Sequence, residues 1–163
     1  MSATVNVAVV GATGAVGEAM VEILEAREFP VDKLYLLASE RSAGSRVAFR
    51  GGHLKVENLE TFDFSGVQIA LFSAGGSVSA EHAPRAAAAG CVVIDNTSHF
   101  RRDNDIPLVG PEVNAHAIGN YPARNIIANA NCSTIQMLVA LKPLYDAAGI
   151  ARINVATYQA VSG

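Results

Sequence analysis

The sequence predicts an α/β protein in which a doubly wound parallel sheet is followed by the beginning of an α+β domain. Apolar strand-like segments alternate with helix-like segments along the 163 residues, an order typical of parallel sheets with right-handed crossovers. Three glycines, Gly11, Gly14 and Gly17, join the first strand-like segment to the first helix-like one. The length suits one domain with part of a second, and we expect the division to fall between residues 1–130 and 131–163.

The first part of the chain predicts two strands, a helix and a hairpin. Residues 5–10 form a nearly continuous apolar run, typical of a strand covered on both faces. After the glycines, an apolar stripe at helical spacing predicts a helix that ends before Pro30. Residues 33–38 predict a second strand, and residues 46–56 predict a hairpin that turns at Gly51-Gly52.

The rest of the chain continues the alternation. Residues 67–72 predict a buried strand, residues 79–89 an alanine-rich helix, and residues 90–95 another buried strand. Residues 96–122 are rich in Pro, Asn and Gly, which predicts a long, irregular and functional connection. Residues 152–160 alternate like a half-buried strand of a second sheet, with no partner strand after them. Because an unpaired strand is unstable, we expect the chain to be the front part of something longer.

Composition and charge exclude several classes of function. The net charge is −3 with no basic block, so the sequence predicts neither a nucleic-acid partner nor a membrane-surface partner. No Lys or Arg precedes Arg27, so a secretory signal is not expected. Asn129, Asn131 and Gln136 interrupt the longest charge-free run, so a membrane span is not expected either. The two cysteines lack metal-ligand spacing, which predicts no metal site and fits a cytoplasmic location.

The three glycines leave room for a pyrophosphate beside a helix N-terminus. The strand before them and the helix after them supply the context that a Rossmann-type dinucleotide loop requires, and the alternative is a tight structural turn. At the end of the second strand, Ser39, Arg41 and Ser42 suit the 2′-phosphate of NADP, because a guanidinium makes charge-assisted hydrogen bonds to phosphate. Glu40 would repel that phosphate if it faced inward, and the alternative is a solvated surface pair of Glu40 with Arg41.

A further glycine turn, Ser73–Gly76, follows the strand at residues 67–72. At the carboxyl edge of the sheet, such a turn allows close approach of the ribose or nicotinamide side of a cofactor. The alternative is a simple helix-entry turn.

Cys132 follows the apolar stretch at residues 125–128 and opens a helix-like segment. A thiol at the first turn of a helix lies at the positive end of the peptide dipoles, which favours the thiolate that attacks carbonyl carbon. The alternative is a buried helix-start thiol. Cys91 lies in a buried-type strand and is expected to be a small core residue. A nucleotide loop and a nucleophilic thiol in one chain predict hydride transfer through a thioester.

Short motifs along nearly the whole chain carry a family resemblance: Gly11–Gly17, Leu37–Gly44, Phe72–Gly76, Asp95–Ser98, Phe100-Arg101, Pro111–Asn114, Asn131–Gln136 and Tyr158–Gly163. In these motifs the chain resembles the amino-terminal half of bacterial aspartate-semialdehyde dehydrogenases. The Asn131–Gln136 block is the most specific of them, and Ala130 stands where members often have proline.

The resemblance implies NADP-dependent interconversion of aspartyl phosphate and aspartate semialdehyde, with inorganic phosphate as co-substrate, in lysine, threonine, methionine and diaminopimelate biosynthesis. It implies Cys132 as nucleophile, Arg101 as the ligand of the phosphate or acyl phosphate, and Gln159 and Asn131 at the substrate. It also implies a homodimer. The cofactor contacts that it implies are Gly11, Thr13, Gly14, Ala15, Val16, Gly17, Ser39, Arg41, Ser42, Ser73, Gly75, Ser162 and Gly163.

The resemblance places the general-base histidine and the arginine for the substrate carboxylate beyond Gly163. None of the chain's own histidines lies in a matching motif: His53, His82, His99 and His116. Two rival functions remain open. One is the related reduction of N-acetylglutamyl phosphate, which Asn131 and Ser133 disfavour, and the other is a non-catalytic NADP-binding fragment.

Overall fold

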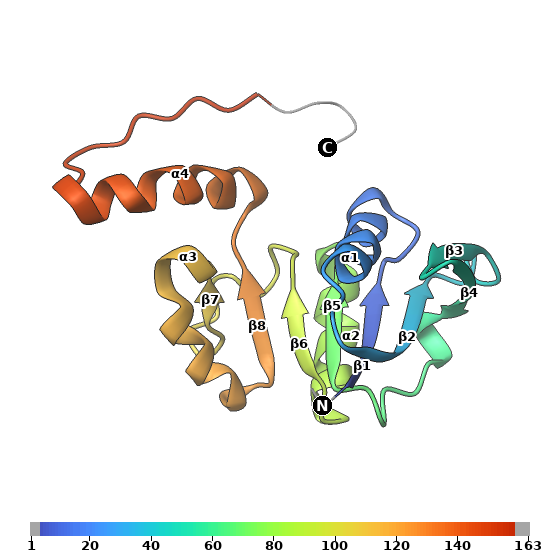
Figure 1. Ribbon diagram of the computed structural model, residues 1–163. Coiled ribbons are helices and arrows are strands. Elements are labelled where there is room, and N and C mark those ends of the chain that lie inside the picture. Colours follow the sequence, from blue (N-terminus) through green and yellow to red (C-terminus); the bar gives the residue numbers. More distant parts are fainter. Residues whose placement is uncertain (1–3, 159–163) are drawn as a thin grey trace.

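The computed structural model describes residues 4–158, and one sheet organises them (Figure 1). Its strand order is β3-β4-β2-β1-β5-β6-β8-β7, and every neighbouring pair is parallel except the β3–β4 hairpin. The strands are β1 (Val5–Val10), β2 (Val31–Ala38), β3 (Arg46–Phe49), β4 (Gly52–Asn58), β5 (Ile69–Phe72), β6 (Val92–Asp95), β7 (Leu108–Val109) and β8 (Ile126–Asn129). The α-helices are α1 (Ala15–Ala26), α2 (Gly76–Ala88), α3 (Pro111–Asn114) and α4 (Cys132–Ala148), with 3-10 helices η1 (Leu59–Thr61) and η2 (Ala115–Ala123).

The sheet is covered on both faces, as a doubly wound sheet requires. Side chains of β1 alternate between two buried clusters because successive residues of a strand point to opposite faces. Val7 and Val9 belong to the cluster that holds Val21 of α1. Val10 belongs to the cluster that holds Ala83 of α2. The predicted fold class is therefore confirmed.

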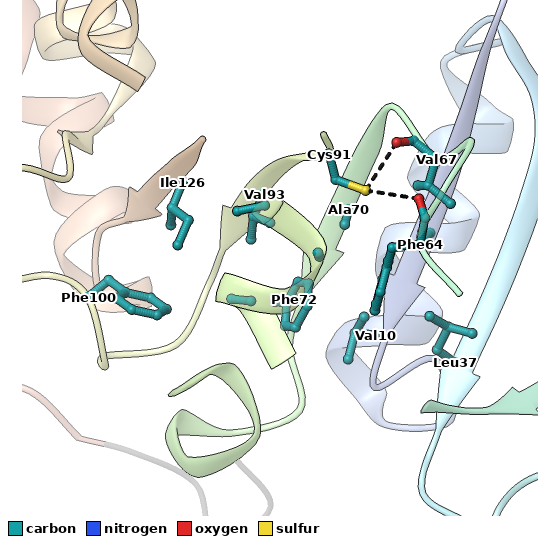
Figure 2. Close-up of a cluster of buried hydrophobic side chains, with 14 of the residues drawn as sticks. Val10, Leu37, Phe64, Val67, Ala70, Phe72, Cys91, Val93, Phe100 and Ile126 are labelled. Carbon is teal, nitrogen blue, oxygen red and sulfur yellow. Dashed lines mark hydrogen bonds between the residues drawn. The ribbon is translucent and has the colours of Figure 1, made fainter. Parts of the chain in front are cut away.

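Cys91 lies in the core cluster on the α2 side, which confirms its predicted role (Figure 2). The cysteine is fully buried among residues that include Phe64, Phe72 and Val93. Its Sγ donates a hydrogen bond to the carbonyl oxygen of Val67 at 3.0 Å. Burial disfavours the charged thiolate and raises the pKa of Cys91 to about 11. We therefore expect Cys91 to react slowly at neutral pH.

The carboxyl ends of the central strands stand in register. Val10 of β1 pairs with Phe72 of β5, Phe72 pairs with Asp95 of β6, and Asp95 pairs with Ala128 of β8. The turns that follow these residues therefore leave the same edge of the sheet, and α4 lies across that edge beyond β8 (Figure 1). From β1 to β8 the edge spans three strand spacings, about 14 Å.

Two predictions of local structure are wrong. Residues 96–122 are not irregular throughout, because they contain β7, α3 and most of η2. Pro111 starts α3 at its first position, where the missing N–H costs nothing. The strand expected at residues 152–160 does not form over 152–158, the part that the structure describes. These residues are exposed and pair with no strand, and an extended segment needs a hydrogen-bonded neighbour to become one.

Across residues 4–158, no helix has the length and apolar character needed to cross a membrane.

Candidate active site

The glycine loop between β1 and α1 is closed by contacts that only glycine permits. Gly11 has a φ of +87°, and a Cβ there would lie 3.0 Å from the backbone nitrogen of Ala74. A Cβ at Gly17 would lie 2.1 Å from the carbonyl oxygen of Gly11, so the first turn of α1 packs directly on the loop. Gly14 precedes α1 without a side-chain cap, which leaves first-turn N–H groups for an anion.

A cavity of about 310 Å³ adjoins this loop at the carboxyl edge of the sheet. It brings together seven of the predicted cofactor residues: Gly11, Thr13, Gly14, Ser39, Arg41, Ser42 and Ser73. A second hollow of about 360 Å³ continues from it along Thr13, Arg41 and Ser42 to Arg46. Among the described residues 4–158, the predicted cofactor residues that line neither hollow are Ala15, Val16, Gly17 and Gly75. The first three of these lie in the first turn of α1, and Gly75 precedes α2.

Arg41 is the cation that both hollows share. Its side chain is exposed, and within residues 4–158 it forms no ion pair. Glu40 lines neither hollow and does not pair with Arg41, so the alternative of a surface ion pair is not what the structure has. A guanidinium that forms no ion pair among the described residues and lines a hollow of about 360 Å³ can bind a phosphate monoester.

The inner wall of the 310 Å³ cavity contains residues that the sequence analysis missed: Leu59, Glu60, Val78 and His82. Leu59 and Glu60 directly follow β4, so a clearer prediction of that strand would have placed them at the same edge. His82 is buried in α2, and its Nε2 lies 3.5 Å from Oε1 of Glu60. Ligand atoms of Glu60, Glu81 and His82 lie within 4.8 Å of one another, but both carboxylates are exposed, which is common without a metal.

Cys132 is the first residue of α4 and is exposed, so it is not a buried helix-start thiol. The helix begins there because Asn131 caps it, with Oδ1 accepting from the N–H groups of Ser133 (3.1 Å) and Thr134 (3.4 Å). The cap occupies the oxygen of Asn131, which was predicted at the substrate, and leaves its Nδ2 available. In the described part of the chain the N–H of Cys132 itself has no acceptor. The sulfur and one free backbone donor therefore lie at the same helix end.

Arg101 reaches the segment that leads into Cys132. Its Nε donates to the carbonyl oxygen of Asn129 at 2.8 Å, and its Nη2 donates to that of Asn96 at 3.0 Å. A longer contact of 3.5 Å joins Nη2 to the carbonyl oxygen of Ala130. The guanidinium thus ties the turn after β6 to the turn after β8. The predicted phosphate ligand and the predicted nucleophile lie on connected segments.

Buried Asp95 anchors the turn that carries Arg101. Its carboxylate accepts hydrogen bonds from the Ser79 hydroxyl at 2.8 Å and from the Thr97 hydroxyl at 2.7 Å. The backbone N–H of Thr97 adds a third bond at 3.1 Å. These bonds fix the start of the turn to α2 and β6. Three predicted residues, Gln159, Ser162 and Gly163, lie outside the described residues.

Comparisons with known proteins show which family and which structures this chain is similar to. The family model for the semialdehyde dehydrogenase NAD-binding domain matches residues 6–121. Aspartate-semialdehyde dehydrogenase 2 of Vibrio cholerae is 69% identical over 163 residues, which are 100% of this chain and 48% of that protein. The chain therefore spans about half the length of the curated relatives it matches.

Two solved structures extend the comparison. A crystal structure of aspartate semialdehyde dehydrogenase II from Vibrio cholerae complexed with ASA superimposes with a TM-score of 0.94 at 68% identity, over 99% of this chain and 53% of that one. The aspartate semialdehyde dehydrogenase of Candida albicans with NADP superimposes with a TM-score of 0.74 at 25% identity, over 91% of this chain and 48% of that one.

Proposed function

The chain belongs to the semialdehyde dehydrogenase family, and from that premise we propose that its protein interconverts L-aspartyl 4-phosphate and L-aspartate 4-semialdehyde with NADP. The reaction would serve aspartate-family amino-acid biosynthesis, towards lysine, threonine, methionine and diaminopimelate. Residues 1–130 would bind the cofactor, and residues 131–163 would begin the catalytic domain. We also propose that the protein is a homodimer and is located in the cytoplasm.

One observation carries it: the turns after β1, β5, β6 and β8 leave one edge of the sheet in register. A dinucleotide whose pyrophosphate lies at Gly11 would extend along that edge, past Ser73, towards the turns that hold Arg101 and Cys132. The cavity beside Gly11 and the exposed sulfur at α4 are the two ends of this path.

The residues present fit NADP. Gly11 and Gly17 exclude side chains where a pyrophosphate must approach the backbone, and Arg41 offers an uncommitted cation for the 2′-phosphate. NADPH, when bound, supplies the hydride. The relative from Candida albicans that was solved with NADP supports this choice of cofactor.

In the reductive direction, the Cys132 thiolate attacks the carbonyl carbon of aspartyl phosphate. A C–S bond forms, the C–O bond to phosphate breaks, and phosphate leaves with its electron pair. Arg101 binds the leaving phosphate through Nη1, because Nε and Nη2 are already bonded to backbone. Hydride addition to the thioester carbon gives a thiohemiacetal, whose collapse releases the aldehyde and restores the thiolate.

The carbonyl oxygen becomes negative at each step. The N–H of Cys132 is the first-turn donor that the Asn131 cap leaves free, and it would stabilise that oxygen. One such donor contributes about 3 kcal/mol. Asn131 then has two roles: its Oδ1 caps α4, and its Nδ2 is available to the substrate.

A test compares turnover with binding for the protein that contains this chain and for its Cys132→Ser variant. We expect NADPH oxidation with aspartyl phosphate, none with N-acetylglutamyl phosphate, and loss of turnover but not of NADPH affinity in the variant. Tight NADPH binding with no turnover would instead favour the second candidate function, a non-catalytic NADP-binding module.

A further inference from the structure

Two asparagine side chains bridge the same turns that Arg101 ties together. Nδ2 of Asn129 donates to Oδ1 of Asn96 at 2.8 Å, and the residues are 33 positions apart in the sequence. The orientation of Asn129 is fixed by a second bond, since its Oδ1 accepts from the N–H of Ala130 at 3.1 Å. The donor and acceptor roles in this bridge are therefore settled by the network.

The bridge and Arg101 share their attachment points. Arg101 bonds the backbone carbonyl oxygens of Asn96 and Asn129, while their side chains bond each other. All these groups are only partly buried, so water competes for them and no single bond is strong. Together they close a ring of three residues between the turn after β6 and the turn after β8.

Some N–H donors of the Arg101 guanidinium are not used within the part of the chain that the structure describes. Arg has five N–H donors in a fixed fork. Nε uses its donor on Asn129, and Nη2 directs its two to Asn96 and Ala130. Within the described residues Nη1 makes no hydrogen bond, so its two donors remain for an anion.

We propose that Asn96 and Asn129 are positioning residues: their side-chain bridge holds the Arg101 guanidinium at a fixed place beside Cys132, with Nη1 free for the anionic group of the substrate. The identity of that anion as an acyl phosphate rests on the proposed function. The positioning itself does not, because it concerns only a cation and a thiol within this chain. Neither asparagine touches the reacting atoms in this scheme.

The test removes one half of the bridge at a time without adding charge. Asn96→Ala removes the oxygen that accepts from Asn129, and Asn129→Ala removes the Nδ2 that donates to Asn96. Asn120→Ala on exposed η2 is the control for loss of an asparagine side chain elsewhere.

The readout is the charge preference of Cys132. Its alkylation rates with iodoacetate and with iodoacetamide are measured by peptide mapping, and each is divided by the rate for glutathione. A carboxylate reagent is favoured by a guanidinium held nearby, and a neutral reagent is not. A unit attraction across roughly 6 Å of water is worth about a threefold change in rate.

We expect the iodoacetate-to-iodoacetamide ratio to be about threefold lower in Asn96→Ala and in Asn129→Ala than in the unsubstituted chain, an effect of the size of one such attraction. NADPH affinity should match between the two variants, and Asn120→Ala should leave the ratio unchanged. If Asn129→Ala fails to fold, Asn96→Ala decides the question, because it removes the acceptor of the bridge and leaves β8 unchanged.

A ratio in folded Asn96→Ala equal to that of the unsubstituted chain would overturn the proposal, and so would an unchanged ratio in folded Asn129→Ala. A ratio for the unsubstituted chain no higher than that of glutathione would also overturn it. Failure of the proposed function is seen separately, as absence of NADPH oxidation with aspartyl phosphate by the protein that contains this chain, when its Cys132 still shows the charge preference.

Discussion

Replacing Arg41 with Ala should weaken NADPH binding far more than NADH binding. Arg41 lines both hollows beside the glycine loop and forms no ion pair within residues 4–158, so its removal leaves no buried group unsatisfied. Because the Arg41 side chain is exposed, we expect the loss of NADPH affinity in the variant to reflect its lost contact with the ligand.

The magnitude follows from the bonds that the guanidinium can make. Hydrogen bonds that involve a charged group contribute about 1.5–3 kcal/mol. Solvent screening and the neighbouring Arg46, which lines the same hollow, favour the lower end. We therefore expect the Kd for NADPH to rise by roughly 10- to 30-fold. The Kd for NADH, which lacks the 2′-phosphate, should change by less than about twofold.

Fluorescence titrations of both nucleotides against both chains measure these constants. Arg27→Ala is the matched control, because Arg27 is an exposed cation at the far end of α1 and lines neither hollow. It removes the same charge and should leave both affinities unchanged. Equal weakening of NADPH and NADH by Arg41→Ala would refute the assignment of Arg41 to the 2′-phosphate.

Two further predictions concern stability. Gly17→Ala should lower the free energy of unfolding by about 2 kcal/mol, because its Cβ would lie 2.1 Å from a carbonyl oxygen, and overpacking outweighs the gain in helix propensity. Gly14→Ala, whose Cβ would make an ordinary 3.5 Å contact, should cost far less in the same urea titrations, and similar losses would contradict the packing argument. Burial raises the pKa of Cys91 from 9.0 to about 11, so the unfolded chain loses this proton first as the pH rises. Stability should then fall between pH 9 and pH 11, by at most about 1.4 kcal/mol per pH unit. Cys91→Ala should remove this part of the slope, and a slope that persists unchanged would show that another group causes it.

Much of the fold follows from local patterns. The apolar run at residues 5–10 is a central strand because both of its faces are covered, and the Gly51-Gly52 hairpin formed where the turn residues predicted it. The α4 helix starts at Cys132 because Asn131 is a strong N-cap. These features depend on residues close in sequence, so the sequence alone determines them.

The features that the sequence did not predict depend on contacts between residues distant in sequence. A two-residue strand such as β7 has too few residues to show periodicity, and residues 152–158 alternate without a neighbour to pair with. The bonds from Arg101 to the carbonyl oxygens of Asn96 and Asn129 could not be predicted either, because backbone oxygens carry no sequence signal. Asn131 was expected at the substrate, while its capping role emerged only from the geometry.

The central claim is that Cys132, at the positive end of α4, is the nucleophile. The most direct measurement is alkylation of the folded chain by iodoacetamide at neutral pH, with each cysteine followed by peptide mapping. We predict that Cys132 reacts faster than glutathione, while Cys91 stays unmodified until the chain unfolds. Equal rates for the two cysteines, or faster reaction of Cys91, would contradict it.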